Sequence, residues 1–319
     1  MTSFKYRPPL LMENGHVQTI FPVLFRRVDP GFYFRERIET DDKDFLDLDW
    51  ALAGSDRLAI LSHGLEGDSH RAYMAGMART LKAGGWDALA WNYRSCSGEP
   101  NRLLRFYHNG ATDDLARVIT HAKNTGRYQK ICLIGFSLGG NLTLVYLGRD
   151  RVDPLVKNAV AFSVPCDLKG SSMMLEKPGN RIYMKRFLVT LHRKIREKMV
   201  LMPGQVDDAG FSSIRTFRDF DNRYTAPIHG FQDAEDYWKQ CSSLQFIRSI
   251  PVPTLIVNAM NDPFLSESCF PIREAGANPN VFLETPLSGG HVGFIEFNAR
   301  NTYWSEKRAL WFLSDTTGL

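Results

Sequence analysis

The sequence predicts an α/β protein in which a mostly parallel, twisted sheet carries helices on both faces and a helical lid inserted between two strands. Three observations lead to this fold class: short apolar runs recur along the chain, helix-length amphipathic segments separate them, and one long interval lacks any such run. Strands that alternate with helices form parallel sheets through right-handed crossovers. We therefore expect one α/β domain with an insertion.

Five apolar runs of four to six residues tend to end in small or polar residues, which is typical of strands buried on both faces. They are residues 58–62, 88–91, 131–134, 159–164 and 254–257. A further strand is expected at 281–284, and alternating apolar and acidic residues at 44–51 predict a half-exposed strand in an edge hairpin. Apolar side chains at helical spacing predict helices at 73–83 and 112–125.

The pattern divides the chain into three segments. Residues 1–40 contain four prolines among aromatic and basic residues, which predicts an irregular N-terminal arm packed on the core. Residues 41–168 and 247–319 hold the strands of the core. The polar, aromatic and helix-prone residues 169–246 are expected to form a lid between the sixth and seventh strands.

The composition is that of an ordinary globular protein. The chain has 319 residues, 44% of them hydrophobic and 23% charged, which excludes disordered, collagen-like and coiled-coil classes. Lys and Arg (39) exceed Asp and Glu (35) by too little to indicate a nucleic-acid partner. No run approaches the roughly 18 apolar residues of a spanning helix, and no signal peptide is recognised. We expect a soluble cytoplasmic protein, and the sequence leaves its oligomeric state open.

The five cysteines give no indication of a disulfide framework or a structural metal. They lie far apart, without a Cys-x-x-Cys pair or a Cys/His cluster at zinc spacing, at positions 96, 132, 166, 241 and 269. This usage fits a reducing cytoplasm. We expect neither a metal nor an organic cofactor.

The strongest local motif is Gly-Phe-Ser-Leu-Gly at 135–139, which follows an apolar strand and precedes a helical pattern. A nucleophile at the apex of such a turn has a strained backbone, and Gly135 and Gly139 remove side chains that would collide there. Ser137 would then project above the sheet, near the positive end of the next helix. The alternative is a glycine-rich turn that contains serine by chance, and the flanking strand and helix weigh against it.

A serine nucleophile needs a base, and the base needs an orienting carboxylate. Asp262 is the only carboxylate in the loop after the 254–257 strand, and His291 lies among glycines after the 281–284 strand. The order serine, acid, histidine is that of Gly-x-Ser-x-Gly hydrolases. The alternative for Asp262 is a helix N-cap. Of the other histidines, we expect surface or capping roles for His70, His108, His121 and His192, and packing or hydrogen bonding for His16 and His229.

Stabilisation of a developing negative charge is the remaining requirement. The 58–62 strand leads into His-Gly-Leu-Glu-Gly at 63–67, a loop of the kind that directs a backbone N–H at an oxyanion. We expect the amides of Leu65 and Leu138 to be the two donors. His63 is expected to brace the loop rather than to transfer protons.

These residues resemble the YheT-like α/β-hydrolases, a family of abhydrolase-domain serine esterases and lipases. The resemblance covers nearly the whole chain and rests, besides the motif at Ser137, on segments 14–20, 62–67, 92–101, 217–221 and 289–294. It implies carboxylic ester hydrolysis with Ser137, Asp262 and His291 as the triad, acting on short acyl esters, acylglycerols or phospholipids. Two positions depart from the family pattern: Asn261 replaces an acidic residue, and Ser95 replaces a glycine.

The lid contains an unusually basic segment. Residues 181–198 carry seven basic residues against Glu197 alone, a net charge of +6 compared with +4 for the whole chain. Apolar residues recur there at helical spacing, so one face is apolar and the rest basic. The helix could cover an acyl pocket, rest on an anionic membrane as a peripheral contact, or pack on the core with a solvated basic face.

Together, the motifs predict acyl transfer from an ester to Ser137 and then to water. Two alternatives use the same sequence features. The same triad could serve an acyltransferase or an amidase, and the scaffold could be a non-catalytic ligand-binding protein. The presence of serine, acid and histidine together weighs against the binding protein.

Overall fold

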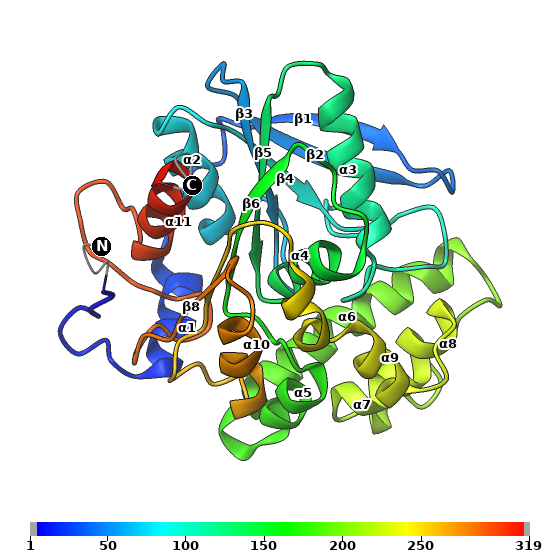
Figure 1. Ribbon diagram of the computed structural model, residues 1–319. Coiled ribbons are helices and arrows are strands. Elements are labelled where there is room, and N and C mark those ends of the chain that lie inside the picture. Colours follow the sequence, from blue (N-terminus) through cyan, green and yellow to red (C-terminus); the bar gives the residue numbers. More distant parts are fainter. Residues whose placement is uncertain (1–4, 316–319) are drawn as a thin grey trace.

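The computed structural model describes residues 5–315 and has one eight-stranded sheet in the order β1-β2-β4-β3-β5-β6-β7-β8 (Figure 1). Strands β3 to β8 are parallel, whereas β2 is antiparallel to both β1 and β4. The strands are β1 (Phe34–Glu39), β2 (Phe45–Ala51), β3 (Arg57–Ser62), β4 (Asp87–Asn92), β5 (Lys130–Phe136), β6 (Val156–Phe162), β7 (Thr254–Val257) and β8 (Val281–Glu284). The predicted α/β fold with a mostly parallel sheet is confirmed.

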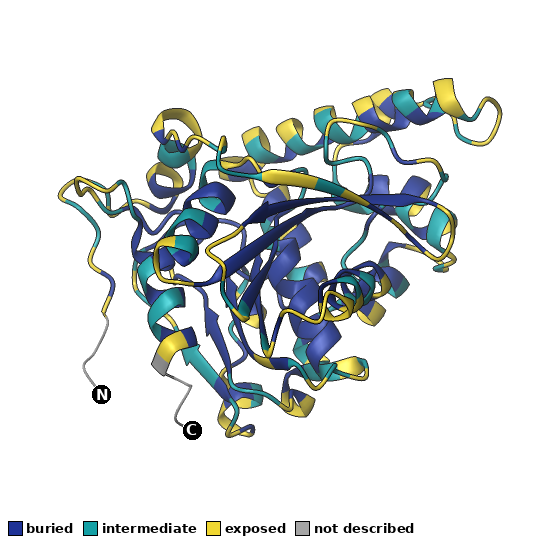
Figure 2. Ribbon diagram, turned by 90° about the horizontal axis from the view of Figure 1, so that it is seen from above, coloured by how far each residue is buried: buried dark blue, intermediate teal, exposed yellow. Residues whose placement is uncertain are grey.

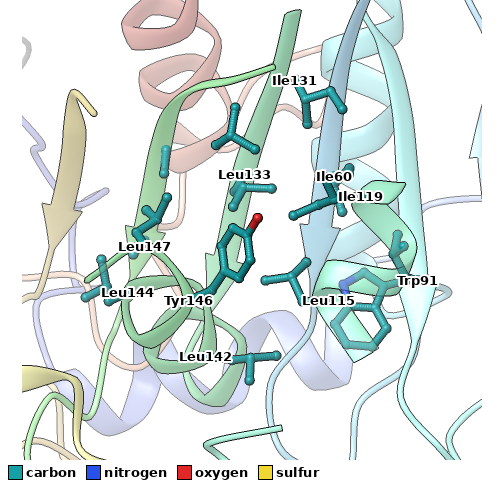
Figure 3. Packing of buried hydrophobic residues seen from close by; sticks show 14 of the residues in the cluster. Ile60, Trp91, Leu115, Ile119, Ile131, Leu133, Leu142, Leu144, Tyr146 and Leu147 are labelled. Atoms are coloured by element: carbon teal, nitrogen blue, oxygen red, sulfur yellow. The ribbon is translucent and has the colours of Figure 1, made fainter. Parts of the chain in front are cut away.

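Helices cover both faces of the sheet. Those outside the lid are α1 (Gly15–Phe25), α2 (Ala72–Ala83), α3 (Thr112–Asn124), α4 (Leu138–Arg149), α10 (Ile272–Gly276) and α11 (Trp304–Asp315). Helices α2 and α11 pack on one face and α3 and α4 on the other, because alternate residues of each strand point to opposite faces. In β3, Leu58 and Ile60 pack toward α3 and α4, whereas Ala59 and Leu61 pack toward α2 and α11. Figure 3 shows Ile60 in the cluster that it forms with residues of α3 and α4, such as Ile119 and Tyr146.

The lid lies between β6 and β7 and consists of α5 (Leu168–Glu176), α6 (Arg181–Leu201), α7 (Phe217–Phe220), α8 (Ala226–His229) and α9 (Ala234–Cys241). Met184, Leu188 and Ile195 of α6 belong to an apolar cluster with Phe220 and Tyr224 of the lid. The cluster also includes Phe264 of the loop after β7. Within residues 5–315, no helix combines the length and the apolar character needed to cross a bilayer.

The edge hairpin is present, but its inner strand is not half-exposed as predicted. Asp47 and Asp49 of β2 are buried, and each faces an arginine of β1 directly across the ladder. The Arg37–Asp47 and Arg35–Asp49 pairs both have N–O distances of 2.7 Å. Because the arginines neutralise the carboxylates, the acidic positions can be covered, and β1 forms the exposed edge instead (Figure 2).

The prediction of an irregular N-terminal arm is wrong, since residues 15–25 form α1 and residues 34–39 form β1. The Asn14 side chain accepts from the backbone N–H groups of His16 and Val17, which caps the helix start. Pro22 lies inside the helix and lacks an N–H. Helix α1 packs against the loop around residue 290, a contact that favours the helix despite this local cost.

Candidate active site

Ser137 lies in the sharp turn between β5 and α4. Its φ is 54° and its ψ is −118°, a strained conformation for a residue with a side chain. A Cβ on Gly135 would lie 2.2 Å from the Gly139 oxygen, and one on Gly139 would lie 2.2 Å from the Ser62 oxygen. Both glycines are therefore required sterically for the turn that the motif predicts.

The three residues predicted to act together lie in one hydrogen-bonded chain. His291 Nε2 is 2.9 Å from Ser137 Oγ, and His291 Nδ1 is 2.9 Å from Asp262 Oδ2. Because a carboxylate only accepts, the neutral imidazole donates its Nδ1 proton to Asp262, which leaves Nε2 to accept the serine hydroxyl. The Asp262 side chain is fully buried, so water does not compete for this interaction.

Asp262 is held by its own loop. The Phe264 N–H donates to Asp262 Oδ1 at 2.9 Å, and the Phe264 ring packs on the imidazole with centroids 4.2 Å apart. The next helical turn begins at Glu267 with Ser266 at its N-cap. The N-cap alternative for Asp262 is therefore wrong.

The His291 loop docks on α1, a contact that sequence reasoning missed. The His291 N–H donates to Thr19 Oγ1 at 2.9 Å, and Asn261 bridges the same two segments by accepting from the Gly290 N–H and donating to the Glu13 carbonyl. A carboxylate at position 261 could not donate to that carbonyl, which explains the asparagine. Segment 14–20 is one of those that resemble the YheT-like family, but its contact partner lies too far along the chain to be inferred from the sequence.

The loop after β3 runs beside Ser137. A Cβ on Gly64 would lie 3.2 Å from the Ser137 Cβ, and the Gly64 N–H donates to Tyr73 Oη at 2.9 Å. Leu65 and Leu138 line the same cavity as Ser137. The structure thus brings the two predicted donor residues to the nucleophile.

His63 has the bracing contacts that we expected. Its Nδ1 lies 2.8 Å from the Gly64 carbonyl and its Nε2 lies 3.2 Å from the Tyr93 nitrogen. Nδ1 must donate and Nε2 must accept, which fixes the neutral tautomer. Burial lowers the pKa of His63 to about 3, so the imidazole is uncharged near neutral pH.

The position of His108 differs from the prediction of a surface or capping residue. It lines the cavity, and its ring lies 4.6 Å from that of His229 and 6.0 Å from that of Tyr237. Burial lowers the pKa of His108 well below its usual value. The lid residues that cover it are more than 100 positions away in the sequence, so no local pattern could show this burial.

A cavity of about 140 Å³ opens at Ser137 and His291 beneath the lid. Most of its wall is apolar and is formed by Leu138, Leu168, Leu175, Phe187, Leu191, Phe217, Phe220 and Phe264. Lys194, Asp221 and His229 add polar groups from the lid. The site is therefore suited to an apolar group that carries a reactive centre beside the serine.

Only some of the basic side chains of the lid helix α6 are exposed to solvent. Arg181, Lys185, Arg186, Arg193 and Arg196 are exposed, but Lys194 and Lys198 are buried. Lys194 pairs with Glu66, and Lys198 donates to the carbonyls of Asn101 and Leu103. The expectation of one apolar and one basic face is wrong at these two positions, because distant core residues supply their partners.

Ser95, the second departure from the family pattern, adopts a φ of 61°, where glycine is favoured. Its hydroxyl donates to Asn101 Oδ1 at 2.6 Å and accepts from the Asn101 N–H at 3.0 Å. These bonds stabilise the turn without a glycine.

Asp221 of the lid lines the cavity, and the effect of burial on its carboxyl group can be tested. It accepts from Trp238 Nε1 and Thr225 Oγ1, and burial raises its pKa from 3.8 to about 6. A raised carboxyl pKa favours folding while the group is protonated, so this contribution is complete below pH 3.8 and is lost as the pH rises through about 6. Asp221→Asn should therefore exceed the wild type in unfolding free energy by about 1 to 3 kcal/mol at pH 8.

In this variant, the amide can accept from Trp238 and donate to Thr225, whose hydroxyl can reverse its role. Urea unfolding at pH 4 and pH 8 measures the difference, which should shrink toward zero at pH 4. An equal gain at both pH values would contradict the assignment of a buried, titrating carboxyl.

The amino-acid sequence of this chain matches those of known proteins. The family described as "alpha/beta hydrolase fold" matches residues 60–297. The Escherichia coli (strain K12) protein YheT is 35% identical over 300 residues, which cover 92% of this chain and 88% of YheT. Human phospholipase ABHD3 is 31% identical over 91% of this chain and 74% of its own length.

A solved structure of the Pyrococcus furiosus esterase Pf2001 has a TM-score of 0.62 at 20% identity, covering 91% of this chain and 95% of the esterase, which shows a shared fold. The family match includes the Ser137 turn, the Asp262 loop and the His291 loop. Relatives of the esterase and lipase type support hydrolase activity. The chain belongs to the α/β-hydrolase family and, within it, to the YheT-like abhydrolases.

Proposed function

We propose that this hydrolase cleaves carboxylic esters through an acyl-enzyme on Ser137. The observation that carries the proposal is the Asp262–His291–Ser137 hydrogen-bond chain, with both links at 2.9 Å, at the base of an apolar cavity. A ligand-binding protein would have no need of a strained serine that is hydrogen-bonded to an oriented imidazole. The same arrangement activates an otherwise weak nucleophile.

In the first step, the Ser137 oxygen attacks the ester carbonyl carbon as His291 Nε2 takes the hydroxyl proton. Asp262 holds the imidazole and stabilises its cation. The carbonyl oxygen becomes an oxyanion, which the N–H groups of Leu65 and Leu138 bind, each lowering the barrier by roughly 3 kcal/mol. When the tetrahedral intermediate collapses, the C–O bond to the alcohol breaks, and the leaving alkoxide takes the proton from His291.

In the second step, His291 removes a proton from water, which attacks the acyl carbon of the Ser137 ester. The oxyanion forms again in the same position. Its collapse breaks the bond to Ser137 Oγ, which recovers its proton from His291, and the carboxylic acid leaves. The enzyme returns to its initial protonation state.

The cavity predicts the size of the acyl group. A volume of about 140 Å³ is similar to that of an engineered apolar cavity of about 150 Å³ that holds benzene. We expect kcat/KM for nitrophenyl esters to fall steeply beyond roughly six acyl carbons. A graded series from acetate to palmitate measures this, and a flat profile would instead favour acylglycerols or phospholipids.

Labelling with a fluorophosphonate probe tests the acyl-enzyme mechanism directly. The wild-type protein should react at Ser137, and Ser137→Ala should remain unlabelled, whereas Ser213→Ala, at an exposed serine of the lid, should label normally. An unlabelled wild-type protein would contradict the proposal. Product analysis with added alcohol separates hydrolysis, which gives the free acid, from acyl transfer, which gives a new ester.

A further inference from the structure

A buried ion pair fastens the lid to the loop that carries Leu65. Lys194 Nζ of α6 lies 2.8 Å from Glu66 Oε1, and the two side chains are only 8% and 5% exposed. Both residues also line the cavity. The pair therefore connects the lid to the residue immediately after Leu65.

Glu66 has a φ of 54°, an unfavourable conformation that surrounding contacts must hold. Tyr107 Oη accepts from the Glu66 N–H at 2.9 Å and donates to Glu66 Oε1 at 2.6 Å. Burial raises the pKa of Tyr107 well above its usual value, so the phenol remains a donor. Tyr107 thus bridges the backbone N–H and the side-chain carboxylate of Glu66. Lys194 connects the same carboxylate to the lid.

Lys194 keeps its charge in this buried position. Burial alone would lower its pKa, but the charge of the Glu66 carboxylate and the hydrogen bonds to Glu66 and to Cys96 Sγ, 2.9 Å from Nζ, raise it overall. Burial raises the pKa of Cys96 to about 11, so Cys96 stays a neutral thiol near neutral pH. The ammonium of Lys194 therefore has the Glu66 carboxylate as its counter-ion.

We propose that Lys194 is a positioning residue that holds the Leu65 amide in line for the oxyanion, so that the oxyanion hole is complete only while α6 is seated on the core. The inference rests on the proposed function, in which the Leu65 N–H is an oxyanion donor. Without Lys194, the Glu66 carboxylate loses its counter-ion and Glu66 can leave its positive φ. The Leu65–Glu66 peptide unit then rotates, the Leu65 backbone dihedrals change with it, and the Leu65 N–H moves out of line.

Lys198 supplies a matched control on the same helix. It is also buried, four residues further along α6, but it donates to the carbonyls of Asn101 and Leu103 rather than to residues 63–67. Its loss should weaken the seating of the lid to a similar degree without releasing Glu66.

The experiment compares Lys194→Met, Lys194→Arg, Glu66→Gln, Lys198→Met and the double variant Glu66→Gln/Lys194→Met, with thermal unfolding of each. For nitrophenyl acetate, we expect kcat of Lys194→Met to fall by roughly 10- to 100-fold with little change in KM, because a displaced donor acts on the transition state. Lys194→Arg should recover part of the loss, and Lys198→Met should keep kcat within about threefold of the wild type.

The double variant removes both buried charges, so it tests the proposal even if Lys194→Met alone does not fold. Its kcat should be no lower than that of the less active of the two single variants, Glu66→Gln and Lys194→Met, since both substitutions remove the same interaction. Equal kcat values for Lys194→Met and Lys198→Met, or wild-type kcat in the double variant, would overturn the positioning role alone. A wild-type protein without any ester hydrolysis would overturn the proposed function and this role with it.

Discussion

Ser137→Ala is expected to lower kcat for nitrophenyl acetate by roughly 10⁵- to 10⁶-fold. The variant removes the proposed attacking atom, since Ser137 Oγ is the hydroxyl bonded to His291 Nε2. Alanine is smaller than serine and leaves the glycine contacts of the turn intact, so the fold should be retained. Steady-state hydrolysis with purified protein measures the effect.

The control for Ser137→Ala is its thermal unfolding, which should match that of the wild type within a few degrees. Residual activity should not label with the phosphonate probe. A variant that retained more than about a hundredth of the wild-type kcat would show that another group attacks the ester, and the acyl-enzyme assignment would be wrong.

Asp262→Asn is expected to lower kcat by roughly 10⁴-fold while the geometry is kept. The Phe264 N–H already donates to Oδ1, so the amide oxygen of asparagine would take that position. Its NH₂ group would then face His291 Nδ1 and donate to it. The imidazole would carry its proton on Nε2 and could no longer accept the proton of Ser137.

The tautomer can be read directly by nitrogen NMR of labelled His291, which should show protonated Nδ1 in the wild type and protonated Nε2 in Asp262→Asn. The rate loss should shrink as the pH rises, because hydroxide can then take the serine proton. A kcat within tenfold of the wild type would indicate that Asp262 does not orient the base.

The parts of the fold that could be predicted are those governed by local pattern. The runs at 131–134 and 254–257 are apolar whichever partner they take, so their burial in parallel strands follows from composition and spacing. Ser137, Asp262 and His291 could be predicted to lie close together because the carboxyl ends of parallel strands meet at one edge of the sheet.

Other features depend on partners that no local pattern reveals. The sequence pattern predicts a solvent-facing Asp47, but Arg37 lies opposite it in the hairpin. It likewise predicts a solvated Lys194, but Glu66 of the core pairs with it. Likewise, α1 is a helix with an internal proline, and it is stabilised by contacts such as that of Thr19 with His291. In each case the deciding interaction joins segments whose proximity only the tertiary structure defines.

The contact of α1 with the His291 loop has a consequence for biosynthesis. Thr19 and His291 are 272 positions apart, so at about 5 to 20 residues per second a ribosome needs roughly 14 to 54 s to make the second after the first. From the synthesis of Ser137 until that of His291, the nascent chain carries the proposed nucleophile without its base. The chain can therefore acquire the proposed activity only after His291 has been made and its loop has docked on α1.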